Sequence, residues 1–208
     1  MNVAVLASGS GTNLQALLDS EKAGTLGAHI ALVISNRSKA GALERALQSG
    51  RNALHLSPAQ FKSQADYTRE LLAVLRGRSI GLVCLAGYLK KLPAEVVSAF
   101  PGRVLNIHPA PLPRFGGEGM FGEHVHRAVL ASGATLSGPT VHFVDLEYDT
   151  GPVVAHTPVP VLPGDTPELL AARVLKAEHE LYPRVVAAVA CGRIRLVAGK
   201  VEGTLDAG

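Results

Sequence analysis

The chain has 208 residues, a length typical of one domain that buries a sizeable core. Its 20 basic and 17 acidic residues leave a net charge of +3 without long charged runs, which argues against nucleic-acid binding. Two cysteines without a CxxC pattern, and the lack of any apolar run near the roughly 18 residues of a membrane span, argue for a cytoplasmic protein with no membrane contact.

In the first half of the chain, short apolar runs alternate with amphipathic stretches. Buried strands are predicted at Val3–Ala7, His29–Ser35, Ser79–Ala86 and Val104–His108. Helices are predicted at Leu14–Ser20, Gly41–Gly50, Asp66–Arg78 and Pro93–Phe100. This alternation predicts an α/β, Rossmann-like fold: an open, mostly parallel, twisted sheet with helices on both faces.

The pattern changes in the second half of the chain, after Gly133. The strand-like pieces Thr140–Asp145 and Pro152–Val161 are too close together for a helical crossover, which predicts an antiparallel pair. A shorter helix is predicted at Glu123–Ser132, and a long one from about Thr166 to Cys191. Because neither a linker nor a repeat is present, residues 1–208 are expected to form a single domain.

A glycine-containing loop, SGSGTN (Ser8–Asn13), follows the first predicted strand and precedes a helix. Glycines let the backbone approach a ligand, and the N-terminus of a helix attracts an anion, so a phosphate is expected here. Packing alone could also explain the glycines. Leu14 replaces the third glycine of an NAD fingerprint, whereas Arg37 keeps an NADP interpretation open; a monophosphate fits best.

Two polar residues end the strand Val104–His108. Asn106 and His108 lie two residues apart and therefore point to the same side, at the carboxyl end of the strand, where ligands bind in such sheets. An amide and an imidazole suit the oxyanion and the proton transfers of acyl transfer. Asp149, in the turn DTGP, is the candidate to orient His108. The alternative is that Asn106 and His108 are satisfied structural groups.

The remaining histidines are weaker candidates. His124 and His126 resemble a metal-binding pair, but side chains two apart on a helix diverge, so no metal site is expected. His142 could hydrogen-bond near the site or serve only the core.

Five motifs occur in order along nearly the whole chain: SGSGTNLQ, SNR, LAGYLKKL, NIHPAPLP and DTGP. Together they resemble the formyl-folate transferase superfamily. The resemblance implies transfer of the formyl group of 10-formyltetrahydrofolate, the co-substrate, to the amine of glycinamide ribonucleotide in purine synthesis, without a metal. It also implies a phosphate side at about residues 1–105, and a folate and catalytic side at about 85–150.

The resemblance further implies roles for individual residues. The substrate phosphate would rest on Gly11, Thr12 and Asn13, and Glu178 would meet the substrate amine. Asn106 and protonated His108 would stabilise the oxyanion, with Asp149 holding His108 charged. The folate would contact Leu85, Leu89, Lys90, Leu92, Asp145 and Asp149.

Two departures from the family pattern stand out. Leu175 occupies a position where a polar residue commonly helps hold the phosphate, and Lys176 is one residue further on. The loop Arg114–His124 is longer and richer in glycine than usual, and we expect it to be mobile and to cover the substrate.

Three alternative functions are weaker. A formyltetrahydrofolate deformylase normally carries an extra N-terminal domain, for which Met1 and Asn2 leave no room. A methionyl-tRNA formyltransferase would need a C-terminal domain and a basic face. A non-enzymatic, Rossmann-type nucleotide-binding regulator would leave Asn106, His108 and Asp149 without a role. The expected partners are the two small-molecule substrates, and the protein is expected to be a monomer or a homodimer.

Overall fold

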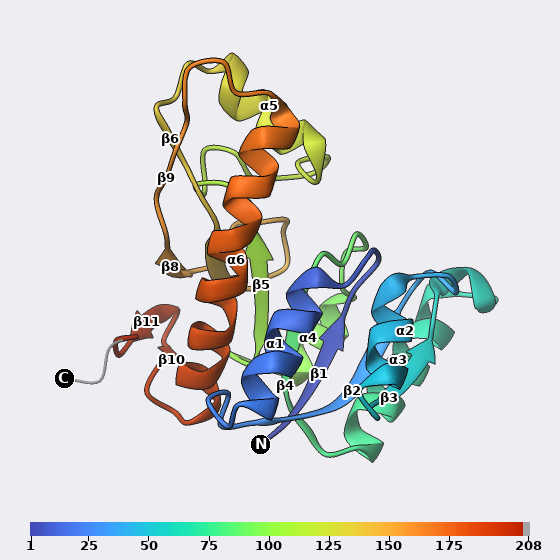
Figure 1. The fold of residues 1–208 in the computed structure, drawn as a ribbon. Helices are drawn as coiled ribbons and strands as arrows, with labels where there is room; N and C mark the ends of the chain where they lie inside the picture. Colours follow the sequence, from blue (N-terminus) through green and yellow to red (C-terminus); the bar gives the residue numbers. More distant parts are fainter. Residues whose placement is uncertain (206–208) are drawn as a thin grey trace. The chain divides into compact units, whose positions relative to one another are not determined.

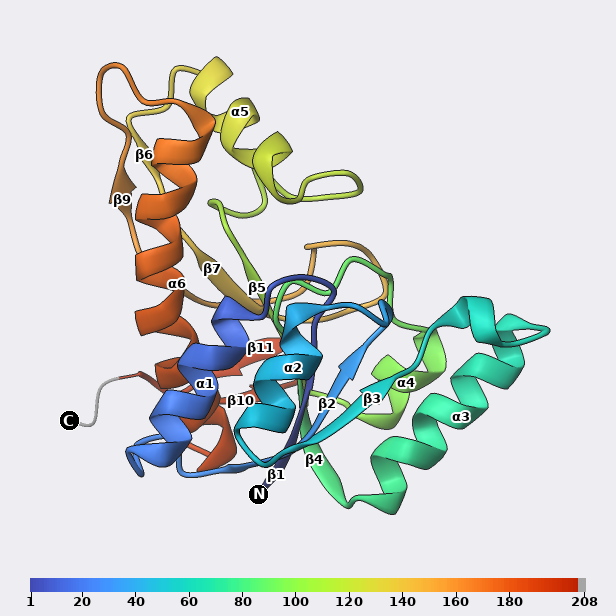
Figure 2. The same ribbon diagram turned by 45° about the vertical axis from the view of Figure 1, so that its right-hand side comes forward.

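The structure, a computed structural model, describes residues 1–205 (Figures 1 and 2). The chain divides into two compact units, Met1–Leu105 and Asn106–Gly208. The boundary falls inside one strand, so each unit contains part of it. The expectation of a single domain remains a prediction.

The first unit is built on parallel strands. Four of them lie in the order β3-β2-β1-β4, and the start of β5 follows β4. These strands are β1 (Asn2–Leu6), β2 (His29–Ser35), β3 (Asn52–His55) and β4 (Ile80–Leu85). Between them run the helices α1 (Thr12–Lys22), α2 (Gly41–Gln48), α3 (Gln64–Gly77) and α4 (Ala94–Ala99), and a 3₁₀ turn, η1 (Pro58–Gln60). Nearly every residue of β1 and β4 is buried, as expected for strands covered on both faces.

The helices of this unit form two pairs. Helix α1 contacts α2, and α3 contacts α4. The chain moves one way along the sheet from β1 to β3 and the opposite way from β3 to β5. Right-handed crossovers therefore place the two pairs on opposite faces of the strands, as Figure 2 shows.

The second unit contains the carboxyl end of β5 (Val104–His108), with β7 (Thr140–Phe143) next to it and β8 (Val153–His156) antiparallel to β7. Its other elements are α5 (Glu123–Ala131), the antiparallel strands β6 (Leu136–Ser137) and β9 (Val159–Pro160), α6 (Pro167–Ala190), and the hairpin β10 (Arg195–Val197) and β11 (Lys200–Glu202). Thr166 caps α6 by accepting a hydrogen bond from the backbone N–H of Leu169, as its sequence predicts.

A small apolar core holds together the two helices of this unit and the segment that leaves β5. Its buried members are Ala110, Phe115, Val125, Val129, Val159, Leu170 and Val174. Phe115 is only 5% exposed, so the chain just beyond β5 is anchored by packing.

The predicted α/β, mostly parallel fold with late antiparallel strands is confirmed. The prediction of a single long strand at Pro152–Val161 is wrong. It is divided into β8, which pairs with β7, and β9, which pairs with β6. Pro158 lies between them and has no N–H to give to a ladder. The short strand β3 was not predicted, because its four residues form too brief an apolar run.

The loop before α1 packs tightly against α2. Gly11 has a φ of +77°, and a Cβ atom at this position would lie 2.7 Å from the Cα atom of Ala42. The backbone N–H of Ala42 donates to the carbonyl of Gly9, and Arg45 Nε donates to the carbonyl of Ser10. Packing therefore accounts for Gly11, whereas nothing lies within 4 Å of a Cβ atom at Gly9.

The substitution Gly11→Ala is expected to lower the free energy of unfolding by about 2–5 kcal/mol, because left-handed strain and overpacking against Ala42 add together. The control Gly24→Ala has a similar φ of +74° but no neighbour within 4 Å, so it should cost only about 1–2 kcal/mol. Urea unfolding of both variants measures the difference. Equal losses would show that contact with Ala42 has no energetic weight.

Candidate active site

Strand β5 ends in the two polar side chains that the sequence singles out. His108 is 3% exposed and Asn106 is half-buried. Each has one firm contact: Nε2 of His108 lies 2.8 Å from the carbonyl oxygen of Phe115, and Nδ2 of Asn106 lies 3.1 Å from Nε2 of His142. Both side chains are therefore held in one orientation.

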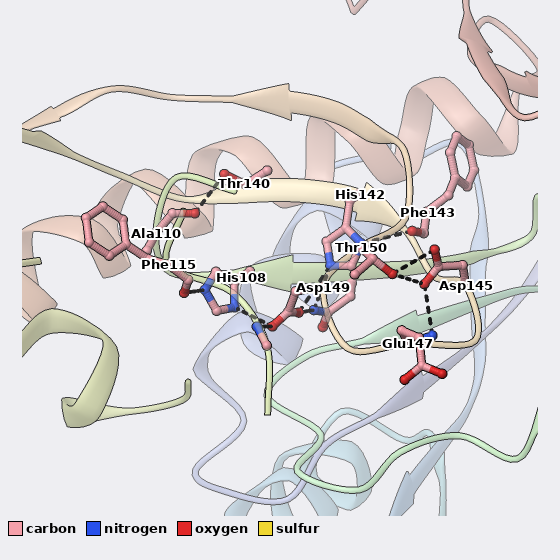
Figure 3. Close-up of polar contacts among 12 residues, drawn as sticks. His108, Ala110, Phe115, Thr140, His142, Phe143, Asp145, Glu147, Asp149 and Thr150 are labelled. Carbon is pink, nitrogen blue, oxygen red and sulfur yellow. Dashed lines mark hydrogen bonds and ion pairs between the residues drawn. The ribbon is translucent and has the colours of Figure 1, made fainter. Parts of the chain in front are cut away.

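The carboxylate of Asp149 lies at the centre of this cluster (Figure 3). Its Oδ2 accepts a hydrogen bond from the backbone N–H of Gly117 at 3.0 Å and lies 3.5 Å from Nδ1 of His108. Its Oδ1 lies 3.4 Å from Nδ2 of Asn106 and 3.5 Å from Nε2 of His142. The structure thus brings Asp149 next to Asn106 and His108, as the sequence predicts.

Two hydrogen-bond donors in the cluster are only loosely held. Nδ1 of His108, which donates when the ring is charged, and the second N–H of Asn106 face Asp149 at 3.5 and 3.4 Å, beyond a normal hydrogen bond of about 2.7–3.2 Å. Donors at such distances are available to an incoming oxygen. The cluster can therefore offer two hydrogen bonds to a substrate oxyanion while its other contacts hold it in place.

His142 belongs to this cluster, although the sequence left its role open. It is 2% exposed, and its Nδ1 lies 2.9 Å from the carbonyl oxygen of Phe143, which fixes a proton on Nδ1. The neutral ring then accepts from Asn106 at Nε2, whereas a protonated ring would donate to Asp149. The signal that could have identified it is strand alternation, because His142 lies on the face of β7 opposite to its neighbours Val141 and Phe143.

The environment shifts the pKa of both His108 and Asp149. Burial lowers the pKa of His108, and the charge of Asp149 and the carbonyl of Phe115 only partly offset this. Burial alone would raise the pKa of Asp149, but contact with His142, the charge of His108 and the N–H of Gly117 hold it below its usual value. Asp149 is therefore ionised at neutral pH, and its negative charge raises the pKa of His108 against the effect of burial.

The DTGP turn places Asp149 by backbone geometry. Asp149 itself has a φ of +57°, which is uncommon for a residue with a side chain. A Cβ atom at Gly151 would collide with the carbonyl oxygen of Phe143, so only glycine fits there. Thr150 Oγ1 donates to Asp145, which also accepts from the N–H of Glu147. The predicted folate contact Asp145 is thus engaged in ordering the turn.

The predicted phosphate loop lies in the first unit and is tied to its neighbours through Ser8. The hydroxyl of Ser8 donates to Oδ1 of Asn36 at 2.6 Å and accepts from the backbone N–H of Leu89 at 2.9 Å. Helix α1 begins at Thr12, and its N-cap residue is Gly11, which has no side chain that could cap the first N–H groups of the helix. An anion could bind those groups. The supporting role of Asn36 was not recognised in the sequence.

The other predicted site residues differ in exposure. Leu85 and Leu92 are buried, Leu89 is half-buried and Lys90 is exposed. Glu178 is a buried carboxylate on α6. Lys176 is exposed and lies roughly 100° around that helix from the half-buried Leu175, so the two side chains leave α6 in different directions.

The helix α5 separates the two histidines of the apparent metal pair. His124 is exposed and His126 is buried. Among residues 1–205, no group of three or more His, Cys, Asp or Glu side chains could hold a metal ion. Across the same residues, no helix has the length and apolar character needed to cross a membrane.

Comparison with known proteins adds to this geometry. Residues 1–186 match the formyl transferase family. The chain is 40% identical over 196 residues to phosphoribosylglycinamide formyltransferase of Escherichia coli K12, covering 94% of this chain and 90% of that one. It resembles the crystal structure of glycinamide ribonucleotide transformylase 1 from Symbiobacterium toebii with a TM-score of 0.92 and 42% identity, covering 98% and 94% of the two chains.

Plant relatives are similar but longer. The chain is 46% identical over 194 residues to the chloroplastic phosphoribosylglycinamide formyltransferase of Arabidopsis thaliana. That match covers 93% of this chain and 66% of the plant protein; for the Vigna unguiculata relative the chain spans 62%.

The substitution Asp149→Asn is expected to lower the pKa of His108 further, because the carboxylate is the main group that raises it against the effect of burial. Titration of the ring signals by NMR measures the shift. At any pH near the pKa, the variant should therefore hold a smaller charged fraction of His108 than the wild type.

A matched control is Asp145→Asn, which removes the same charge four residues away, from a carboxylate bonded to Thr150 and Glu147 instead of the cluster. Its effect on His108 should be clearly smaller. An unchanged or raised pKa in Asp149→Asn would mean that the carboxylate does not act on the ring.

Proposed function

Because the chain belongs to the formyl transferase family, we propose that it transfers the formyl group of 10-formyltetrahydrofolate to the amine of glycinamide ribonucleotide in purine biosynthesis. The observation that carries the proposal is the pair of loosely held donors, Asn106 Nδ2 and His108 Nδ1, around the Asp149 carboxylate. The identity of the substrates is inferred from the family, and the cluster has the hydrogen-bond donors that acyl transfer requires.

The proposed reaction proceeds by direct attack. The substrate amine forms a bond to the formyl carbon, whose carbonyl oxygen becomes an oxyanion. The intermediate then collapses, the bond from the formyl carbon to N10 of the folate breaks, and N10 takes up one proton while the amine has lost one. The protein must therefore stabilise one negative charge and allow one proton to move.

Asn106 and His108 would meet the first need. The second N–H of Asn106 and the Nδ1 proton of His108 would donate to the oxyanion instead of Asp149, while the contacts to His142 and to the Phe115 carbonyl keep both side chains in place. The oxyanion would itself favour the charged form of His108, adding to the effect of Asp149 in the transition state. Asp149 would then relay the proton.

The other residues of the proposal bind the substrates. Gly11, Thr12 and Asn13 would take the phosphate at the N-terminus of α1, and Glu178 would meet the substrate amine. The folate would contact Leu85, Leu89, Lys90 and Leu92 and the turn from Asp145 to Asp149. The Michaelis constant of the variant Lys176→Ala for glycinamide ribonucleotide measures any contribution of Lys176 to the phosphate site.

We also propose that the protein acts in the cytoplasm, as a monomer or a homodimer, on small-molecule substrates and without a metal. The plant relatives are named chloroplastic, and that location is theirs.

An assay of the folate product with and without glycinamide ribonucleotide tests the proposed activity. A product that forms only with the ribonucleotide supports transfer. A product formed equally without it would instead indicate hydrolysis of the donor, and no product in either assay would indicate a binding protein.

The substitution Asn106→Ala is expected to lower turnover by roughly 10²-fold or more, since losing one donor to an oxyanion costs about 3 kcal/mol of transition-state stabilisation. A control is Asn52→Ala, which removes an exposed amide whose contact is the carbonyl of Ala31 and should leave turnover near normal. Near-normal turnover in Asn106→Ala as well would remove Asn106 from the mechanism.

A further inference from the structure

The segment Phe115–Gly117 touches both members of the His108–Asp149 pair through its backbone. The carbonyl oxygen of Phe115 lies 2.8 Å from Nε2 of His108, and the N–H of Gly117 donates to Oδ2 of Asp149 at 3.0 Å. Neither contact involves a side chain of the segment. Figure 3 shows the first of them, with Phe115 reaching His108 from the side opposite to Asp149.

The contact to Phe115 determines which nitrogen of His108 can titrate. A carbonyl oxygen only accepts hydrogen bonds, so Nε2 must carry a proton in both the neutral and the charged ring. The second proton is therefore gained and lost at Nδ1, the nitrogen that faces Asp149 at 3.5 Å. The contact to Gly117 meanwhile holds the oxygen of Asp149 that Nδ1 faces.

The segment approaches Asp149 closely at Gly116. A Cβ atom at Gly116 would lie 2.5 Å from Cδ2 of Leu112 and 2.8 Å from Cβ of Asp149, and Gly117 has a φ of +107°. A residue with a side chain at position 116 would push Asp149 or the segment away. Gly116 therefore permits the close approach to Asp149, Gly117 adopts a backbone conformation that side chains disfavour, and the buried ring of Phe115 anchors the segment in the core.

We propose that Phe115–Gly117 is a positioning segment, whose backbone fixes the proton on Nε2 of His108 and the carboxylate of Asp149, leaving Nδ1 to act. The kinetic consequence of this positioning rests on the proposed function, whereas the placement of the proton on His108 does not depend on it.

Three titratable groups face His108, and they agree with this assignment. Asp149 comes from the turn after β7, His142 from β7 and His126 from α5. His126 is buried, its Nδ1 has no hydrogen-bond partner within the described residues, and repulsion from His108 adds to burial in lowering its pKa. Compared with His126, His108 alone has both an ionised carboxylate and the Phe115 carbonyl beside it, so a proton shared between these two rings favours His108.

The test follows ¹⁵N signals of the His108 ring through a pH titration, in the full chain and without substrate. In the wild type, Nε2 is expected to stay protonated throughout while only Nδ1 titrates. In Gly116→Ala, the neutral ring should become a mixture of both tautomers. A neutral wild-type ring protonated at Nδ1 would overturn the proposal, even if Gly116→Ala did not fold.

The matched control is Gly119→Ala, in the same loop. Its φ of +83° makes alanine strained there, but a Cβ atom would meet nothing within 4 Å, so the His108 signals should remain those of the wild type. Wild-type signals in Gly116→Ala, or mixed tautomers in both variants, would also contradict the proposal.

Kinetics separate a positioning role from a structural one. Gly116→Ala should lower kcat on the order of tenfold to a hundredfold with little change in KM, because misplaced donors affect the transition state most. If the wild type had no transferase activity, the proposed function would fail while the ring signals still tested the positioning segment. An unchanged kcat in an active Gly116→Ala enzyme with mixed tautomers would show that the positioning does not serve catalysis.

Discussion

The carboxylate of Asp149 is the interaction on which the candidate site depends. It takes a hydrogen bond from the Gly117 backbone and lies within 3.5 Å of polar nitrogens on Asn106, His108 and His142. These groups come from three separate parts of the chain, and each is also held by a second contact. Asp149 can therefore remain ionised despite its burial, and its negative charge in turn favours protonation of the ring beside it. Without the carboxylate, this largely buried cluster of two histidines and an amide would have no negative charge to orient its hydrogen-bond donors.

The surrounding backbone keeps this arrangement from relaxing. The carbonyls of Phe115 and Phe143 each bind one ring nitrogen, so the orientations of His108 and His142 are set by strand and loop backbone instead of by mobile side chains. Glycine occurs where a Cβ atom would block these approaches, at Gly116 beside Asp149 and at Gly151 beside Phe143. His108 is held closely at Nε2 and loosely at Nδ1, and Asn106 is held closely by His142 and loosely by Asp149. The cluster is therefore rigid and still has loosely held groups that can meet an incoming oxygen.

The sequence predicted those parts of the protein that depend on local pattern. Strand alternation placed Asn106 and His108 on one side of β5, and apolar periodicity predicted the helices α2, α3 and α4. The proximity of Asp149 could be proposed only because its turn carries residues typical of a loop near a cleft, and the structure bears this proximity out. The membership of His142 in the cluster and the contacts of Gly116 and Gly117 depend on how distant segments fold together. No periodicity in one segment encodes which atom of another it will meet, so these features needed the structure.

The glycine-rich loop Arg114–His124, which we expect from its sequence to be mobile and to cover the substrate, has two parts that differ in their contacts. Its first residues are not free: Phe115 is packed in the core, and Gly117 is bonded to Asp149. Beyond them, Gly119 and Gly122 have positive φ values and nothing near a Cβ position. Glycine therefore has two different physical uses in one loop, close approach at the start and backbone freedom further on. Movement in the later part, if the loop closes over a substrate, need not disturb the contacts that hold His108 and Asp149, so loop movement and the placement of the His108 proton can be separate properties of the same segment.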